Sequence, residues 1–143
     1  MLENSVCEYN LMTKEEYQNY LSEWKNLDNA NVYDKGEYFD VFKTSDLLIT
    51  DCSSFLAEYY PSKKPIIFLN RKDRAPFDAF GNIIKKGFYI ANNFQEVEEL
   101  LANIAQNKND NLKKTREKIL QKHFYMKNTT YKKITEFLCS LIN

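Results

Sequence analysis

The feature that most constrains the fold is a pair of short apolar runs separated by a polar turn and a helical stretch. Leu47–Ile49 and Ile66–Leu69 are continuous apolar runs, which are typical of parallel strands covered on both faces. Between them, the small polar residues Asp51-Cys52-Ser53-Ser54 lead into a helical segment that ends near Pro61. The order strand, turn, helix, strand predicts an α/β fold with a parallel sheet.

Further elements repeat this alternation. Thr13-Lys14-Glu15-Glu16 is a capping box that predicts a helix to about Leu27. Residues Asn70–Lys86, which contain Pro76 and Gly81, are expected to form the longest loop. Strands are also expected at Asn31–Tyr33 and Phe88–Ile90, and helices at 38–44, 94–106, 112–123 and 131–141. Right-handed crossovers would place helices on both faces of the sheet, within a single domain over residues 1–143.

The composition is that of one ordered globular domain. The 143 residues include only three glycines and three prolines, and 43% are hydrophobic. No apolar run approaches the roughly 20 residues that a membrane-spanning helix needs. The three cysteines, Cys7, Cys52 and Cys139, lie far apart, which favours a reducing, cytoplasmic setting over a disulfide framework.

Charge is unevenly distributed although the chain is neutral overall. Residues 1–60 carry 4 basic and 12 acidic side chains, and residues 108–133 carry 9 basic and 2 acidic ones. The basic segment is either a solvated helical face or a patch that meets an anionic membrane surface or polymer. A nucleic-acid partner is not expected, because few aromatic residues are interleaved and no binding motif is present.

The turn after the first strand is the candidate binding site. Ser53 and Ser54 would present hydroxyl and N–H groups at a helix N-terminus, at the carboxyl end of a strand. Ligands of open α/β sheets bind at that edge, and a helix N-terminus favours phosphate. Asp51 begins the turn, and Glu58 lies one helical turn beyond Ser54, where its carboxylate could bind ribose hydroxyls. The pattern predicts a site for a nucleotide phosphate.

Plainer interpretations stay open for each of these residues. Asp51 or a serine could simply cap the helix, with Glu58 on the surface. Cys52 is either a low-pKa thiol or, more simply, a small residue buried under the turn. His123 is interpreted as a bystander, and Arg71, Lys72 and Arg74 either contact phosphate or belong to a solvated loop. No metal-ligand spacing, P-loop or GxGxxG motif occurs, so neither a metal nor a cofactor is expected.

The segment 45–69 resembles a known family. Ser45-Asp46-Leu47-Leu48-Ile49-Thr50-Asp51-Cys52-Ser53-Ser54, followed by Lys63-Lys64-Pro65-Ile66-Ile67-Phe68, resembles the nucleotide-binding half of CDP-glycerol glycerophosphotransferases of teichoic acid and capsular polymer synthesis. The resemblance implies a Rossmann-like three-layer domain that is half of a GT-B fold, with C-terminal helices. It implies that a nucleotide-activated donor such as CDP-glycerol binds here, with Ser53 and Ser54 on the pyrophosphate, Asp51 shaping the turn and Glu58 on ribose.

Residues 51–58 are also similar to a turn of UDP-N-acetylglucosamine 2-epimerases. In those enzymes the residue that matches Glu58 holds the ribose. The double serine Ser53-Ser54 in place of two glycines favours the glycerophosphotransferase. A UDP-sugar enzyme half remains the alternative within this fold.

One departure from the family concerns catalysis. The family carries a histidine in an H-P motif and another in an N-terminal acceptor domain, and this chain contains neither motif. The chain is therefore expected to be a fragment that needs a separate N-terminal GT-B domain and does not transfer alone, located in the cytoplasm and peripherally at the inner face of the cell membrane. A third hypothesis is a non-catalytic docking module that acts through Lys113, Lys114, Arg116 and Lys118.

Overall fold

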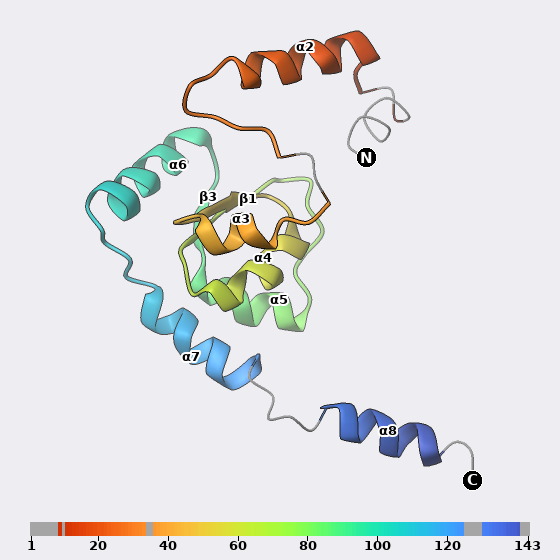
Figure 1. Cartoon of the computed structure of the whole chain (residues 1–143). Helices are drawn as coiled ribbons and strands as arrows, with labels where there is room; N and C mark the ends of the chain where they lie inside the picture. The colour runs from red at the N-terminus through yellow and green to blue at the C-terminus, as the bar shows by residue number, and fades with distance from the viewer. Residues whose placement is uncertain (1–8, 10, 34–35, 125–129, 141–143) are drawn as a thin grey trace. The chain divides into compact units, whose positions relative to one another are not determined.

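The computed structural model describes residue 9 and residues 11–33, 36–124 and 130–140 (Figure 1). The chain divides into two compact units, Met1–Val41 and Phe42–Asn143. Each unit is described by itself below. The candidate turn and all the described strands belong to the second unit.

The first unit contains α2 (Lys14–Lys25), and its predicted capping box is confirmed. The hydroxyl of Thr13 accepts from the amide of Glu16 at 3.2 Å, and the Glu16 carboxylate accepts from the amide of Thr13 at 2.7 Å. The strand predicted at Asn31–Tyr33 is wrong, since these residues have no regular structure. The backbone groups of a strand need a neighbouring strand, and the described residues of this unit contain none.

The second unit holds a parallel sheet in the order β1-β2-β3. Leu48 of β1 pairs with Ile66 of β2, in a ladder that continues to Thr50 and Phe68. The predicted α/β class with a parallel, Rossmann-like sheet is confirmed. The strands are β1 (Leu48–Thr50), β2 (Ile66–Leu69) and β3 (Tyr89–Ala91).

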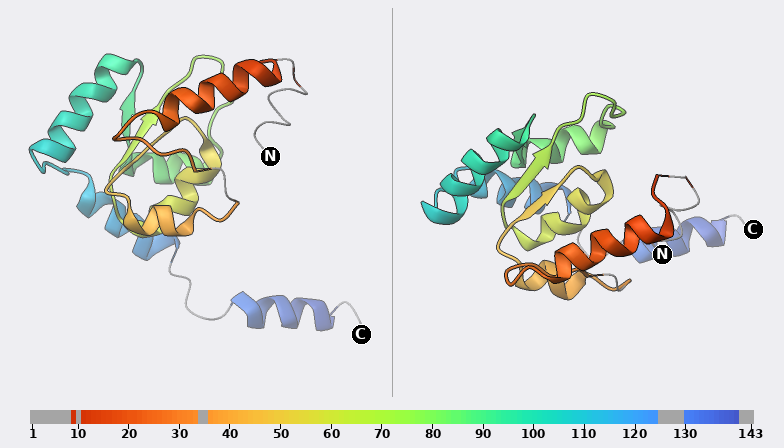
Figure 2. Two further views of the ribbon diagram at one scale, coloured as in Figure 1. Left: turned by 45° about the horizontal axis from the view of Figure 1, so that its top comes forward. Right: turned by 90° about the horizontal axis from the view of Figure 1, so that it is seen from above.

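Helices precede, connect and follow these strands in the chain. The path runs from β1 through α4 to β2, and from β2 through α5 to β3 (Figure 2). A π-helical turn, η3, extends α6. The bounds are α3 (Phe39–Thr44), α4 (Ser53–Tyr59), η1 (Tyr60–Ser62), α5 (Ala79–Ile84), η2 (Lys85–Gly87), α6 (Phe94–Leu101), η3 (Ala102–Gln106), α7 (Lys113–His123) and α8 (Thr130–Ser140).

Apolar side chains pack on both faces of the sheet, because alternate strand residues point to opposite sides. Ile66 and Phe68 enter a cluster with residues of α4, α5 and α7, whereas Ile67 enters a second cluster with residues of α6 and η3. The predicted placement of helices on both faces is therefore confirmed. The buried members of the first cluster are Leu56, Tyr59, Tyr60, Ile66, Phe68, Ile84, Phe88 and Leu120, and those of the second are Ile67, Ala91, Val97 and Ile104.

The expectation of one long loop over Asn70–Lys86 is wrong in its second half, where α5 forms. Asp78 is the N-cap of this helix, and its carboxylate accepts from the amide of Gly81 at 2.6 Å. An acidic cap ahead of Ile83 and Ile84 was a helix signal in the sequence. The helix returns the chain toward β3 and so forms the second crossover.

The Lys63-Lys64-Pro65 motif has a structural role that sequence reasoning missed. The ammonium of Lys64 donates to the carbonyls of Phe42 at 3.2 Å and Lys43 at 2.6 Å, and also to that of Ser45. Carbonyls in the last turn of a helix lack partners within the helix. Lys64 supplies these partners to α3 and ties it to the start of β2.

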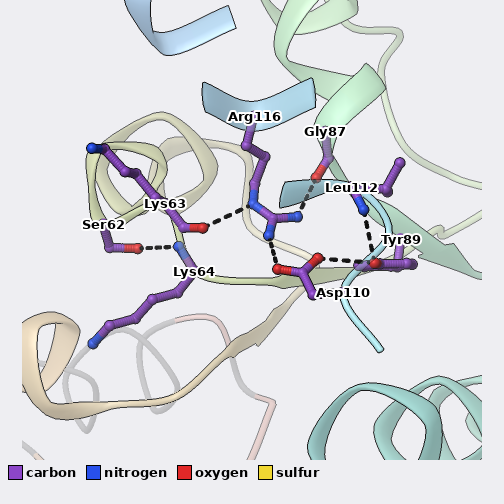
Figure 3. A network of polar contacts seen from close by, with 8 residues as sticks. All are labelled: Ser62, Lys63, Lys64, Gly87, Tyr89, Asp110, Leu112 and Arg116. Atoms are coloured by element: carbon purple, nitrogen blue, oxygen red, sulfur yellow. Dashed lines mark hydrogen bonds and ion pairs between the residues drawn. The ribbon is translucent and has the colours of Figure 1, made fainter. Parts of the chain in front are cut away.

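A buried arginine joins the two crossovers. The side chain of Arg116 on α7 is fully buried. Its guanidinium donates to the carbonyls of Lys63 and Gly87, each at 3.2 Å, and to the carboxylate of Asp110 (Figure 3). Asp110 also accepts from the hydroxyl of Tyr89 at 2.9 Å. The charge is thereby paired and each of the three guanidinium nitrogens donates a hydrogen bond, which a buried charge requires.

Gly87 allows this close approach. A Cβ at residue 87 would lie 2.7 Å from Cγ of Arg116 and nearer still to the hydroxyl of Tyr60. Burial raises the pKa of Tyr60 to about 12. A side chain at position 87 would displace both neighbours, so the network depends on a glycine there.

We expect Arg116→Met to destabilise the fold by about 3 kcal/mol, since removing one member of a buried ion pair leaves the other unpaired. Asp110 would lose its cationic partner, and the carbonyls of Lys63 and Gly87 would lose the guanidinium donor. Urea unfolding of both proteins gives the difference in the free energy of unfolding.

The matched control is Lys118→Met, which removes an exposed charge from the same helix. It should change the free energy of unfolding by no more than about 0.5 kcal/mol. Equal stability of Arg116→Met and Lys118→Met would contradict a supporting role for Arg116.

Candidate functional site

The polar residues that follow the three strands meet at the carboxyl edge of the sheet. Asp51 follows β1, Asn70 follows β2 and Asn92 follows β3. The backbone amide of Asn70 donates to the carbonyl of Ala91 at 2.8 Å. The side-chain amide of Asn70 donates to the side-chain oxygen of Asn92 at 3.1 Å. This edge is where ligands bind in open α/β sheets.

The turn between β1 and α4 is held by short-range bonds that leave hydroxyls at the surface. The amide of Cys52 donates to the hydroxyl of Thr50 at 3.0 Å. Cys52 is the N-cap of α4, but its side chain makes no capping hydrogen bond. Ser53 and Ser54 are both exposed. The turn therefore offers accessible hydroxyl and N–H groups in a fixed backbone conformation.

The structure places the four predicted site residues on one exposed segment. Asp51, Ser53 and Ser54 lie in the turn, and Glu58 is exposed on α4. Glu58 lies four positions after Ser54, so their side chains lie on the same helical face. Their assignment to a ligand remains a prediction.

Arg71 links the loop after β2 to this turn. Its guanidinium binds Asp51 at 3.1 Å and Asp73 at 2.6 Å. The hydrogen bonds to Asp73 and then to Asp51 raise the pKa of Arg71, and the bond from Arg71 lowers the pKa of Asp73. These groups are exposed, so the contact orients the two loops and adds little stability.

The thiol of Cys52 is exposed and not buried under the turn as the simpler interpretation held. Its sulfur lies 3.2 Å from the hydroxyl of Ser54. That hydrogen bond lowers the pKa of Cys52, and the amides of Ser54 and Phe55 act in the same direction. The helix-capping position explains the exposure, because it sends the side chain toward the surface of the first turn.

The basic segment differs from expectation at one position. Arg116 is buried, so it cannot belong to a cationic surface, whereas Lys113, Lys114 and Lys118 are exposed. The single histidine, His123, lies half-buried in the last turn of α7. Cys7 lies outside the described residues.

The described parts of the chain contain neither a membrane-spanning helix nor a metal-binding cluster. No helix there has the length and apolar character needed to cross a membrane. No group of three or more His, Cys, Asp or Glu side chains there could hold a metal ion.

One comparison with known proteins gives a match. The sequence model of the family described as CDP-glycerol:poly(glycerophosphate) glycerophosphotransferase matches residues 8–138. The match includes the turn after β1 and the loop after β2. No curated protein and no solved structure matches the chain.

We expect Cys52 to be alkylated by iodoacetamide with a pH midpoint below the value of about 8.5 for an ordinary cysteine. The hydrogen bond from Ser54 favours the thiolate. Ser54→Ala should raise the midpoint, and Ser53→Ala should not, since that hydroxyl does not bond the sulfur. Peptide mapping by mass spectrometry measures alkylation at Cys52 alone. Identical profiles for the two variants would contradict this role of Ser54.

Proposed function

The chain belongs to the CDP-glycerol:poly(glycerophosphate) glycerophosphotransferase family, and we propose that its second unit binds the nucleotide-activated donor, CDP-glycerol or a close relative. The observation that carries the proposal is the exposed serine turn at the carboxyl end of β1. In parallel α/β sheets this position receives phosphates. The motif Ser45–Ser54, which resembles the family, spans the same turn.

Asp51, Ser53, Ser54 and Glu58 have distinct roles in this proposal. Ser53 and Ser54 donate hydrogen bonds to the pyrophosphate without placing a negative charge beside it. Asp51 would repel the phosphates if its carboxylate were free, but it is paired with Arg71. Glu58, one helical turn away, binds the ribose hydroxyls. Fixed neutral donors of this kind stabilise phosphate charge at low reorganisation cost.

The reaction in the complete transferase follows from the donor. An acceptor hydroxyl oxygen attacks the β-phosphorus, the bond from that phosphorus to the bridging oxygen breaks, and CMP leaves. A general base takes the hydroxyl proton. The base expected from the family is the histidine of an H-P motif, which this sequence lacks, so the second unit supplies donor binding and we expect no transfer by this chain alone.

The partners in this proposal are a separate acceptor-binding GT-B domain and an anionic surface. A donor nucleotide is a cytoplasmic substrate, and its phosphate is transferred to a cell-surface polymer such as teichoic acid or capsular polysaccharide. Exposed lysines of the segment 108–133, among them Lys113, Lys114 and Lys118, would hold the protein peripherally at the inner face of the membrane.

The test is an NMR titration of the chain with CDP-glycerol, CDP and UDP. We expect shifts centred on residues 51–58, larger for cytidine than for uridine nucleotides. A dissociation constant on the order of 1 mM, or about −4 kcal/mol, counts as binding by one half of a cleft. Ser53→Ala combined with Ser54→Ala should weaken this binding at least about tenfold, which is about 1.4 kcal/mol.

The matched control combines Ser22→Ala with Ser140→Ala, which removes two exposed hydroxyls from other helices. It should leave the titration unchanged. Tighter binding of UDP than of CDP would instead indicate a domain that binds a UDP-sugar. The absence of shifts at residues 51–58 with all three ligands would contradict donor binding at this turn.

A further inference from the structure

We propose that a basic pocket beside the loop after β2 binds a phosphate group, as a site separate from the serine turn. The pocket has a volume of about 210 Å³. None of its residues belongs to the turn 51–54, so the inference does not depend on donor binding there. Its polar lining consists of Asn70, Arg71, Arg74, Asn82 and Lys85.

Two cations of the pocket are held on one aromatic ring. The guanidinium carbon of Arg74 lies 3.6 Å from the centre of the Phe77 ring and 4.8 Å from that of Phe68. The ammonium of Lys85 lies 5.6 Å from the centre of the Phe77 ring. Distances below about 6 Å are typical of cation–π contacts. Because Phe68 is fully buried in the core, Arg74 is anchored on a rigid support.

Neither cation is neutralised by the protein. Of the three arginines in the sequence, Arg71 and Arg116 each pair with carboxylates. Within the described residues, Arg74 and Lys85 make no ion pair. Two like charges close to one ring repel each other, and an anion between them would remove that repulsion.

The nearby carboxylates are engaged elsewhere. Both oxygens of Asp73 accept from Arg71, at 3.0 and 2.6 Å. The carboxylate of Asp78 caps α5 through the amide of Gly81. The side chain of Asn82 donates to the carbonyls of Phe77 and Asp78, each at 2.9 Å. The wall of the pocket is thus fixed before any ligand enters.

The chemistry of the lining indicates a phosphate. A guanidinium fork matches the oxygens of phosphate in a bidentate geometry, and an ammonium adds a point charge. The volume is below the range of about 300–1,000 Å³ found for drug-sized ligands. The pocket therefore has room for a phosphate group and not for a whole nucleotide.

The test is an NMR titration of the full 143-residue chain with inorganic phosphate, at an ionic strength held constant with chloride. We expect saturable shifts of the amides of residues 70–85. Arg74→Gln and Lys85→Gln should each weaken binding about tenfold, by loss of a charge-assisted hydrogen bond. Arg74→Lys keeps the charge and should retain part of the affinity.

The matched controls are Lys72→Gln and Lys86→Gln, which remove exposed charges next to lining residues. They should weaken binding less than about twofold if the site is specific. Urea unfolding identifies any variant that fails to fold. If either Arg74→Gln or Lys85→Gln fails to fold, the phosphate affinity of the other variant tests the proposal. Shifts that do not saturate, or an equal loss with Lys86→Gln and Lys85→Gln, would overturn the proposal.

Two sources can supply the phosphate, the donor diphosphate and a poly(glycerophosphate) acceptor. If the donor supplies it, Arg74→Gln will weaken binding of CDP and leave that of CMP unchanged. If the acceptor supplies it, the same variant will weaken binding of a short poly(glycerophosphate) oligomer and leave CDP unchanged. The double variant Ser53→Ala and Ser54→Ala tests nucleotide binding at the turn separately. The absence of binding at the turn can therefore be distinguished from the absence of phosphate binding in the pocket.

Discussion

The buried guanidinium of Arg116 is the interaction on which the second unit most depends. It binds the carbonyl of Lys63 shortly before β2, the carbonyl of Gly87 shortly before β3, and the carboxylate of Asp110 ahead of α7. These contacts lie at the amino ends of the strands. A fully buried charge with a hydrogen bond from each nitrogen fixes both crossovers at that edge, which leaves the opposite, carboxyl edge available for a ligand.

The three arginines of the chain illustrate three uses of one side chain. Arg116 is buried and paired, and it supports the fold. Arg71 is exposed between two carboxylates and connects the turn after β1 with the loop after β2. Arg74 has aromatic contacts and no carboxylate among the described residues. Of the three arginines, only Arg74 carries a charge that a bound anion would neutralise.

Local sequence signals predicted much of this structure correctly. The capping box at Thr13, the apolar runs of β1 and β2, and the helix that begins at Phe94 all depend on neighbours within a few residues. Because the hydrophobic pattern of Ile66–Leu69 is continuous, burial on both faces was also foreseeable.

The errors arose where distant residues decide the outcome. Asn31–Tyr33 had strand-forming side chains but no strand to pair with among the described residues of its unit. Arg116 looked like one more charge in a basic helix, and only the packing of β2, β3 and α7 shows that it is buried. The pocket was equally hidden, because α5 brings Lys85 back to Arg74 from eleven positions along the chain.

The most direct test of the account is protection of Cys52 from alkylation by a bound nucleotide, because this exposed thiol lies within the proposed donor site. The exposed thiol of Cys139 on α8 serves as the internal reference. We expect CDP to slow alkylation of Cys52 and to leave that of Cys139 unchanged. Equal rates at Cys52 with and without saturating CDP would contradict the placement of the donor at this turn.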